Sequence, residues 1–291
     1  MPLPEFEFLR PKTLAEALEM LSATPDAMPI AGGTNLIVDM RGGKLQPGTL
    51  VDIGGLPELC CIHEKDGHLL IGGGAKLAEL LDDPMIERDV PILCQMARTF
   101  ANTLIRNRAT VGGNLVNAAP CADTAPVLLV LDAQVELTSA SGARWMPLSK
   151  FLVGAFQTKR RPDELLTAIR CPIPPSGSVG GFRKMGLRKI SCMAKVDVAA
   201  YVERDEAGRC RVARLALGAA SAAAMRAPEA EAALVGQPLT PERIDEAARL
   251  AETAAQPRAG SEYKHQVVYG LARRILTEIA LRPAERKGEA R

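Results

Sequence analysis

The sequence predicts an α+β protein built from two small α/β units and a C-terminal α+β domain. Two observations predict the first two units: an apolar run typical of a strand leads twice into a glycine pair and then into an amphipathic, helix-like segment. A third observation predicts the last domain, where two alternating runs turn back on each other and helical patterns follow. We therefore place the domains at residues 1–58, 59–175 and 176–291.

The composition is that of a chain with buried cores, and it excludes several functional classes. Of 291 residues, 47% are hydrophobic and 24% are charged, and the formal net charge is only +2. No basic block that could follow a nucleic-acid backbone is present, and no run of about 20 apolar residues occurs. The N-terminus lacks the apolar core of a signal peptide. We expect a cytoplasmic protein with no nucleic-acid partner and no stable membrane insertion.

The seven cysteines and three histidines do not form a recognisable metal or catalytic pattern. The cysteines are odd in number and scattered, unlike a disulfide framework or the CxxC pairs of zinc and iron–sulfur sites. No constellation of histidine and carboxylate residues suggests acid/base catalysis. We therefore predict no metal site and no catalytic residues in this chain.

The first unit begins with a helix signal and contains the first glycine pair. Thr13 and Glu16 form a capping box before an apolar stripe that stops near Pro25. The stretch PIAGGTNLIVDMR (29–41) then predicts a strand, a glycine loop and a short helix ending at Gly42-Gly43. The run TLVDI, beginning at Thr49, predicts another strand.

The second unit repeats this pattern. HLLIGGGAKLAELL (68–81) predicts a strand, a glycine run and a helix, and residues 91–100 predict a further helix. NRATVGGNLVNAAPCADTAPVLLVLDAQVEL (107–137) contains the second glycine pair, and strand-like runs follow over 127–131 and 135–137.

The last domain follows a linker predicted over CPIPPSGSVGG (171–181). Two antiparallel strands are predicted to turn at 205–208, and Thr240-Pro241 starts a helix. The charged tail at 282–291 is predicted to be solvated. A second helix is predicted from an apolar stripe at helical spacing, which consists of Tyr263, Val267, Leu271, Ile275 and Ile279.

The two glycine pairs have two possible explanations. Glycine permits positive φ and lets another group approach the main chain, so consecutive N–H groups can converge on a phosphate. The alternative is a tight turn between strand and helix. Because a pyrophosphate can be held from two sides, two similar loops favour the phosphate interpretation more than one would. Neither loop has the GxGxxG or GxxxxGK[ST] spacing of common nucleotide sites.

Together, the segments PIAGGTNLIVDMR and NRATVGGNLVNAAPCADTAPVLLVLDA resemble the paired FAD-binding signatures of the flavoprotein (medium) subunits of molybdenum hydroxylases. This family includes carbon monoxide dehydrogenase, and its FAD domain also occurs within xanthine dehydrogenase. The resemblance covers essentially the whole chain. It implies an FAD-binding fold of the vanillyl-alcohol-oxidase (PCMH) type, in which two α/β subdomains bind FAD, plus a C-terminal α+β domain with a small antiparallel sheet.

The resemblance also implies which residues bind FAD. Backbone N–H groups of 31–36 and 110–114 would hold the pyrophosphate, and the hydroxyls of Thr34 and Thr110 could donate as well. The implied residues of the two motifs are Pro29, Ile30, Ala31, Gly32, Gly33, Thr34, Asn35 and Leu36, and Thr110, Val111, Gly112, Gly113 and Asn114.

Three further positions match the family's cofactor contacts, and each also has a structural explanation. Phe100 would lie near the cofactor, or it packs in the core at the end of an apolar helix. Asp123 would accept hydrogen bonds from sugar or ribityl hydroxyls, or it is a turn or capping residue. Leu166 would lie against the flavin, or it is simply buried.

Lys184 and Met193 complete the implied set. Lys184 would stabilise the reduced flavin or a phosphate, or it is a solvated surface lysine. Met193 stands where some carbon monoxide dehydrogenase medium subunits have a tyrosine over the flavin ring. It would pack on the ring, or it is buried filler.

The resemblance implies an FAD-binding electron-transfer subunit. A large partner subunit would carry the molybdopterin cofactor and a small one the [2Fe–2S] clusters, with a dimer of heterotrimers as the assembly. One alternative is a self-sufficient flavin oxidoreductase with its own substrate pocket, and another is a scaffold that keeps the fold without electron transfer. Neither the substrate nor the terminal electron acceptor follows from this chain.

Overall fold

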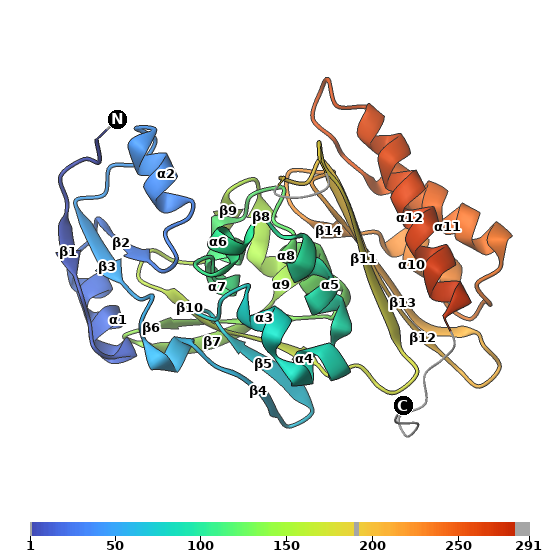
Figure 1. Cartoon of the computed structure of the whole chain (residues 1–291), viewed down its shortest axis with the longest axis horizontal. Helices are drawn as coiled ribbons and strands as arrows, with labels where there is room; N and C mark the ends of the chain where they lie inside the picture. Colours follow the sequence, from blue (N-terminus) through green and yellow to red (C-terminus); the bar gives the residue numbers. More distant parts are fainter. Residues whose placement is uncertain (1, 189–191, 283–291) are drawn as a thin grey trace. The chain divides into compact units, whose positions relative to one another are not determined.

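A computed structural model describes residues 2–188 and 192–282 of the chain, which form two compact units with interleaved sequences (Figure 1). Unit 1 comprises Met1–Leu80, Asn102–Ala118 and Ala133–Cys171, and unit 2 comprises Leu81–Ala101, Ala119–Asp132 and Pro172–Arg291. The three consecutive domains expected from the sequence stay a prediction. The mixture of helices with small antiparallel sheets confirms the predicted α+β class.

Unit 1 contains a three-stranded parallel sheet in the order β1-β3-β2. Its elements are β1 (Glu7–Leu9), α1 (Leu14–Ala23), β2 (Ala27–Ile30), α2 (Leu36–Arg41) and β3 (Thr49–Asp52). The Thr13 hydroxyl accepts a hydrogen bond from the N–H of Glu16 (3.2 Å), as the capping box predicts. The strand, glycine loop and short helix expected over 29–41 are all present, and α2 ends before Gly42.

A second, five-stranded sheet in unit 1 has the order β4-β5-β10-β6-β7. Its strands are β4 (Ile62–Lys65), β5 (His68–Gly72), β6 (Gln134–Ser139), β7 (Gly142–Pro147) and β10 (Leu165–Pro172). The helix expected within 68–81 is reduced to the single turn α3 (Glu79–Asp82). The unit is completed by η1 (Pro57–Leu59), α6 (Thr103–Arg106), α7 (Val111–Asn117), α9 (Leu148–Phe151), β8 (Leu152–Gly154) and β9 (Gln157–Thr158).

Unit 2 is built on the antiparallel sheet β11-β12-β13-β14, with helices on both faces (Figure 1). The strands are β11 (Val179–Met185), β12 (Val196–Arg204), β13 (Cys210–Gly218) and β14 (Met225–Arg226). One face packs against α10 (Pro228–Leu234), α11 (Pro241–Ala254) and α12 (Tyr263–Leu281). The other face contacts α5 (Pro91–Thr99) and α8 (Thr124–Val130), and α4 (Pro84–Asp89) packs against α5.

The alternation of β12 assigns its side chains to these two faces. Val196, Val198, Ala200 and Val202 belong to the core formed with α10–α12. Asp197, Ala199 and Tyr201 therefore point to the α8 face. This assignment agrees with Arg214, the register partner of Tyr201, which donates to the carbonyl of Val130 at the end of α8.

Several predictions for unit 2 are confirmed. The hairpin turns between β12 and β13 as expected, and the Thr240 side chain caps α11 by accepting from the N–H of Arg243. In α12, Ile275 and Ile279 are buried but Tyr263 is 48% exposed. A spacing of four residues advances about 40° beyond a full helical turn at each step, so the predicted stripe rotates out of the core.

Two predictions for unit 2 were wrong. The strand-like run at 127–131 lies mostly in helix α8, and every residue of that helix is buried. The predicted linker ends earlier than expected, because Val179 already begins β11.

Of the charged tail, residues 283–291 lie outside the described residues. Within the described ranges, no helix is both long enough and apolar enough to cross a membrane.

Candidate functional site

The first glycine pair lies in the loop between β2 and α2, and both glycines are required there for structural reasons. Gly33 has φ +69°, a left-handed conformation that other residues adopt at a cost. A Cβ on Gly32 would lie 1.9 Å from the carbonyl oxygen of Arg108. The bare backbone of this loop therefore allows it to sit directly against the segment that leads into the second glycine pair.

The same loop has unused hydrogen-bond donors. Within the described part of the chain, the backbone N–H groups of residues 32–35 have no protein acceptor. Arg108 lies beside them, because its Nε donates to the carbonyl of Gly32 (3.2 Å) while the side chain remains exposed. Free N–H groups next to a guanidinium form a suitable cradle for a phosphate anion.

The second glycine pair is engaged differently. The N–H of Val111 donates to Ala75, that of Gly112 to Gly73, and that of Asn114 to the carbonyl of Thr110. The N–H of Gly113 donates to the hydroxyl of Thr110 (3.0 Å), which caps α7. This differs from the prediction that the second motif offers its N–H groups to a pyrophosphate, because these four protons are used within unit 1.

Glycines bring three segments of unit 1 together through their backbones. A Cβ on Gly112 would lie 2.5 Å from the oxygen of Gly73, and a Cβ on Gly73 would lie 2.0 Å from the oxygen of Leu166. Leu166 is buried in β10, as the structural explanation of this residue requires. The segments that contain both motifs and Leu166 are thus joined in one unit.

Sequence reasoning missed Gly73 and Arg108. The glycine run 72–74 was a visible signal for the first, because consecutive glycines after a strand often mark a close backbone approach. The signal for Arg108 was weaker: a basic residue two positions before Thr110 in NRATVGGN.

Unit 2 holds Asp123 and Lys184 in a buried ion pair. The ammonium of Lys184 lies 2.5 Å from Oδ2 of Asp123 and also donates to the carbonyl of Thr99 (3.3 Å). The two side chains are 6% and 3% exposed, so Lys184 is not the solvated surface lysine of the alternative explanation. Among the residues that the structure describes, Asp123 accepts no capping hydrogen bond at the start of α8.

The ion pair with Lys184 engages only one of the two carboxyl oxygens of Asp123. Its Oδ1 is buried and has no hydrogen-bond partner among the described residues. Burial raises the pKa of Asp123 to about 6, although the charge of Lys184 acts in the opposite direction. A polar group that is buried without a partner is a candidate ligand-binding atom.

The two remaining predicted positions differ in their burial. Phe100, next to Thr99, is 9% exposed at the end of α5, as core packing requires. Met193 is 77% exposed, so its interpretation as buried filler was wrong.

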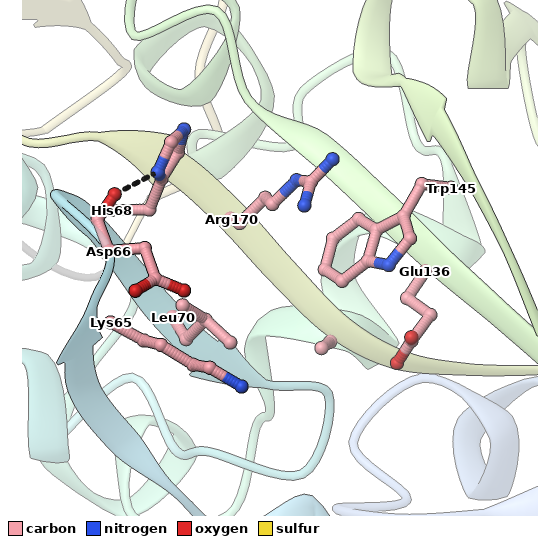
Figure 2. Close-up of a pocket in the computed structure, with 8 residues that line it drawn as sticks. Lys65, Asp66, His68, Leu70, Glu136, Trp145 and Arg170 are labelled. Atoms are coloured by element: carbon pink, nitrogen blue, oxygen red, sulfur yellow. Dashed lines mark hydrogen bonds between the residues drawn. The ribbon is translucent and has the colours of Figure 1, made fainter.

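A separate pocket of about 410 Å³ lies on the five-stranded sheet of unit 1 (Figure 2). The guanidinium of Arg170 stacks over the ring of Trp145 (4.2 Å), and Nδ1 of His68 bonds to the carbonyl of Asp66. Glu136 faces this pocket while its neighbour Leu137, the register partner of Leu166, is fully buried. Because side chains alternate along a strand, the pocket lies on the opposite face of the sheet from Leu137.

No site for a metal ion is evident in the described ranges: no three His, Cys, Asp or Glu side chains come together there in a way that could hold one. All seven cysteines are free thiols.

Bare glycines, free N–H groups and an arginine in unit 1 form a candidate site for a phosphate-bearing cofactor. Residues 4–174 match the domain family described as the FAD-binding domain in molybdopterin dehydrogenase, and residues 181–279 match the carbon monoxide dehydrogenase flavoprotein C-terminal domain. The chain therefore belongs to the family of FAD-binding flavoprotein subunits of molybdopterin dehydrogenases, which are oxidoreductases, and this confirms the resemblance inferred from the sequence.

Individual relatives agree with this membership. The carbon monoxide dehydrogenase medium chain of Afipia carboxidovorans is 33% identical, over 93% of this chain and 95% of its own length. The putative xanthine dehydrogenase FAD-binding subunit of Escherichia coli K12 is 32% identical, over 92% and 94%. Carbon monoxide dehydrogenase from Hydrogenophaga pseudoflava superposes with a TM-score of 0.94 at 29% identity, covering 98% of this chain and 100% of that chain.

Proposed function

We propose that this chain is the FAD-binding electron-transfer subunit of a molybdenum hydroxylase complex. It accepts electrons from the [2Fe–2S] clusters of a small partner subunit and passes them to an external acceptor. Membership of the flavoprotein family and relatives named as medium chains or FAD-binding subunits support this role. The observation that carries the proposal is the glycine cradle with its free N–H groups.

The first loop supplies the main pyrophosphate contacts. The N–H groups of residues 32–35 donate to the phosphate oxygens, and the guanidinium of Arg108 neutralises their charge. The Thr110 hydroxyl accepts from Gly113, so its own proton is available to donate as well. The remaining residues of the two motifs position these groups.

In unit 2, we propose that Asp123 and Lys184 contact FAD, together with Phe100 and Met193. The carboxylate of Asp123 accepts hydrogen bonds from hydroxyl groups, and Lys184 holds it in place with its ammonium. Leu166 of unit 1 supplies an apolar contact. Bound FAD supplies reversible electron transfer, and no acid/base step is assigned to this chain.

The expected partners are a large molybdopterin-binding subunit and a small [2Fe–2S] subunit, assembled as a dimer of heterotrimers in the cytoplasm. Relatives described as a medium chain or as a subunit of a dehydrogenase complex support a complex of several subunits. The free thiols agree with a reducing compartment.

The test is the absorption spectrum of the gently purified protein, followed by identification of the released chromophore and by measurement of FAD affinity in variants. We expect flavin bands with about one FAD per chain, and loss of FAD from G32A and R108Q. G55A is the matched control, because a Cβ at Gly55 meets nothing within 4 Å. A colourless protein that cannot be reconstituted with FAD would refute the proposal.

A further inference from the structure

Asp197 is a fully buried carboxyl for which the proposed function has no use. It lies in β12 with 0% exposure, and neither of its oxygens has a hydrogen-bond partner among the described residues. On the α8 face of the sheet, its register partners are Lys184 on β11 and Gly218 on β13. Side chains of directly paired residues are neighbours on one face, so Asp197 stands beside the lysine of the Lys184–Asp123 pair.

Gly218 leaves room for this carboxyl. A Cβ on Gly218 would lie 2.0 Å from Oδ1 of Asp197, so any larger residue there would displace the carboxyl group. The position of Asp197 is thus determined by two strands at once: a lysine on one side and a bare backbone on the other.

The charged groups around Asp197 are already committed to other partners. Lys184 is bonded to Asp123, and Lys264 on α12 donates to the carbonyl of Ala219. The thiol of Cys121, which is half-buried, also interacts with Asp197. An ionised Asp197 would therefore compete with Asp123 for the ammonium of Lys184.

Burial raises the pKa of the Asp197 carboxyl well above its ordinary value of 3.8, and the nearby carboxylate of Asp123 raises it further. The charges of Lys184 and Lys264 oppose this rise. Because both carboxyl oxygens lack a partner among the described residues and both lysines are engaged elsewhere, this environment favours the neutral acid over the carboxylate.

We infer that Asp197 is a positioning residue that acts through the Lys184–Asp123 pair: it remains a neutral acid, so that Lys184 keeps Asp123 as its one carboxylate partner. Ionisation of Asp197 at alkaline pH draws Lys184 away from Asp123 and weakens the contact between this pair and FAD. This inference rests on the proposed function, in which the pair contacts FAD.

The test compares the wild type with D197N, which mimics the neutral acid, across a pH series. FAD affinity and the visible circular dichroism of bound FAD are measured at each pH. We expect D197N to match the wild type at neutral pH, and the wild type alone to lose affinity several-fold at alkaline pH. The control is D132N, which changes a half-exposed carboxylate paired with Arg214 and Arg226 in the same unit.

An alkaline transition that persists in D197N would overturn the inference, and so would a D197N protein that binds FAD weakly already at neutral pH. If no variant binds FAD, the proposed function fails, and the FAD-free protein then decides the inference separately. Its free energy of unfolding is expected to fall with rising pH above about pH 6 in the wild type and to stay level in D197N. If the free energy of unfolding changes with pH in the same way in both proteins, the inference that Asp197 is a neutral acid is refuted.

Discussion

Replacing Lys184 by methionine leaves the buried carboxyl of Asp123 without its counter-charge. The two groups are 2.5 Å apart and almost completely buried, so water does not replace the lost ammonium. Removing one partner of a buried ion pair typically costs about 3–5 kcal/mol, since a charge then remains buried alone. We expect K184M to lose about this much stability at pH 8.

The stability that K184M loses relative to the wild type should depend on pH. The pKa of Asp123 is about 6 in the folded protein against an ordinary value of 3.8, so the folded state holds the proton more tightly. The contribution of Asp123 to stability therefore falls by about 3 kcal/mol as pH rises from about 4 to 6 in the wild type and then levels off, so that any further decline above pH 6 comes from Asp197. Without Lys184 the pKa rises further, and the decline in stability continues to higher pH. At pH 5, where the carboxyl is mostly protonated in both proteins, the difference should shrink to about 1 kcal/mol.

The assay is urea denaturation of the FAD-free proteins at several pH values, followed by far-ultraviolet circular dichroism. The double variant D123N/K184M should recover stability above pH 6, because it removes the isolated charge. K150M is the control, since Lys150 is exposed on α9 of unit 1. A loss below about 1 kcal/mol that is the same at all pH values would refute this reasoning.

Four other substitutions test separate parts of the structure. G32A forces the Arg108 carbonyl away from a Cβ at 1.9 Å, so we expect the thermal midpoint to fall by several degrees relative to G55A. E164Q weakens the hydrogen bonds to Arg144 and costs about 1–3 kcal/mol in urea denaturation. Burial raises the pKa of Glu164, but its bonds to Arg144 and Arg161 outweigh this effect and lower it, so its contribution should disappear as pH falls below about 4.5. T240A removes the cap of α11 and should cost about 1 kcal/mol, whereas T253A, on the exposed side of that helix, should cost less. G218A should displace Asp197 and abolish the difference between wild type and D197N in the pH series.

Elements with a local physical cause could be predicted from the sequence. Thr13 and Thr240 bind backbone N–H groups three residues away, so the helix starts are encoded within a few positions. The hairpin of β12 and β13 is similarly local. Helix α8 could not be recognised, because it is buried on all sides and its apolar run lacks the period that separates a helix from a strand.

The candidate site was predictable in its chemistry but not in its hydrogen bonding. Two glycine pairs indicate close backbone approach, and both are close-packed in unit 1. Which group approaches each glycine depends on residues far away in the sequence: the oxygen that fills the space at Gly32 belongs to Arg108. The sequence therefore could not reveal that the N–H groups of residues 32–35 have no acceptor among the described residues, while four N–H groups of the second loop are used.

The sequence indicates that Asp197 of unit 2 is buried, but it does not predict the partners or the protonation state of this carboxyl group. The run VDVAAYV places Asp197 among residues that are buried on both faces of β12, where an isolated charge is unfavourable. Such a carboxyl must be paired, bound to a ligand or neutral, and the sequence alone does not choose. The structure narrows the choice, because Lys184 is taken by Asp123 and Gly218 gives the carboxyl space but no donor side chain. A neutral Asp197 is the state consistent with both neighbours, and its proton is then what allows the Lys184–Asp123 pair to remain undisturbed.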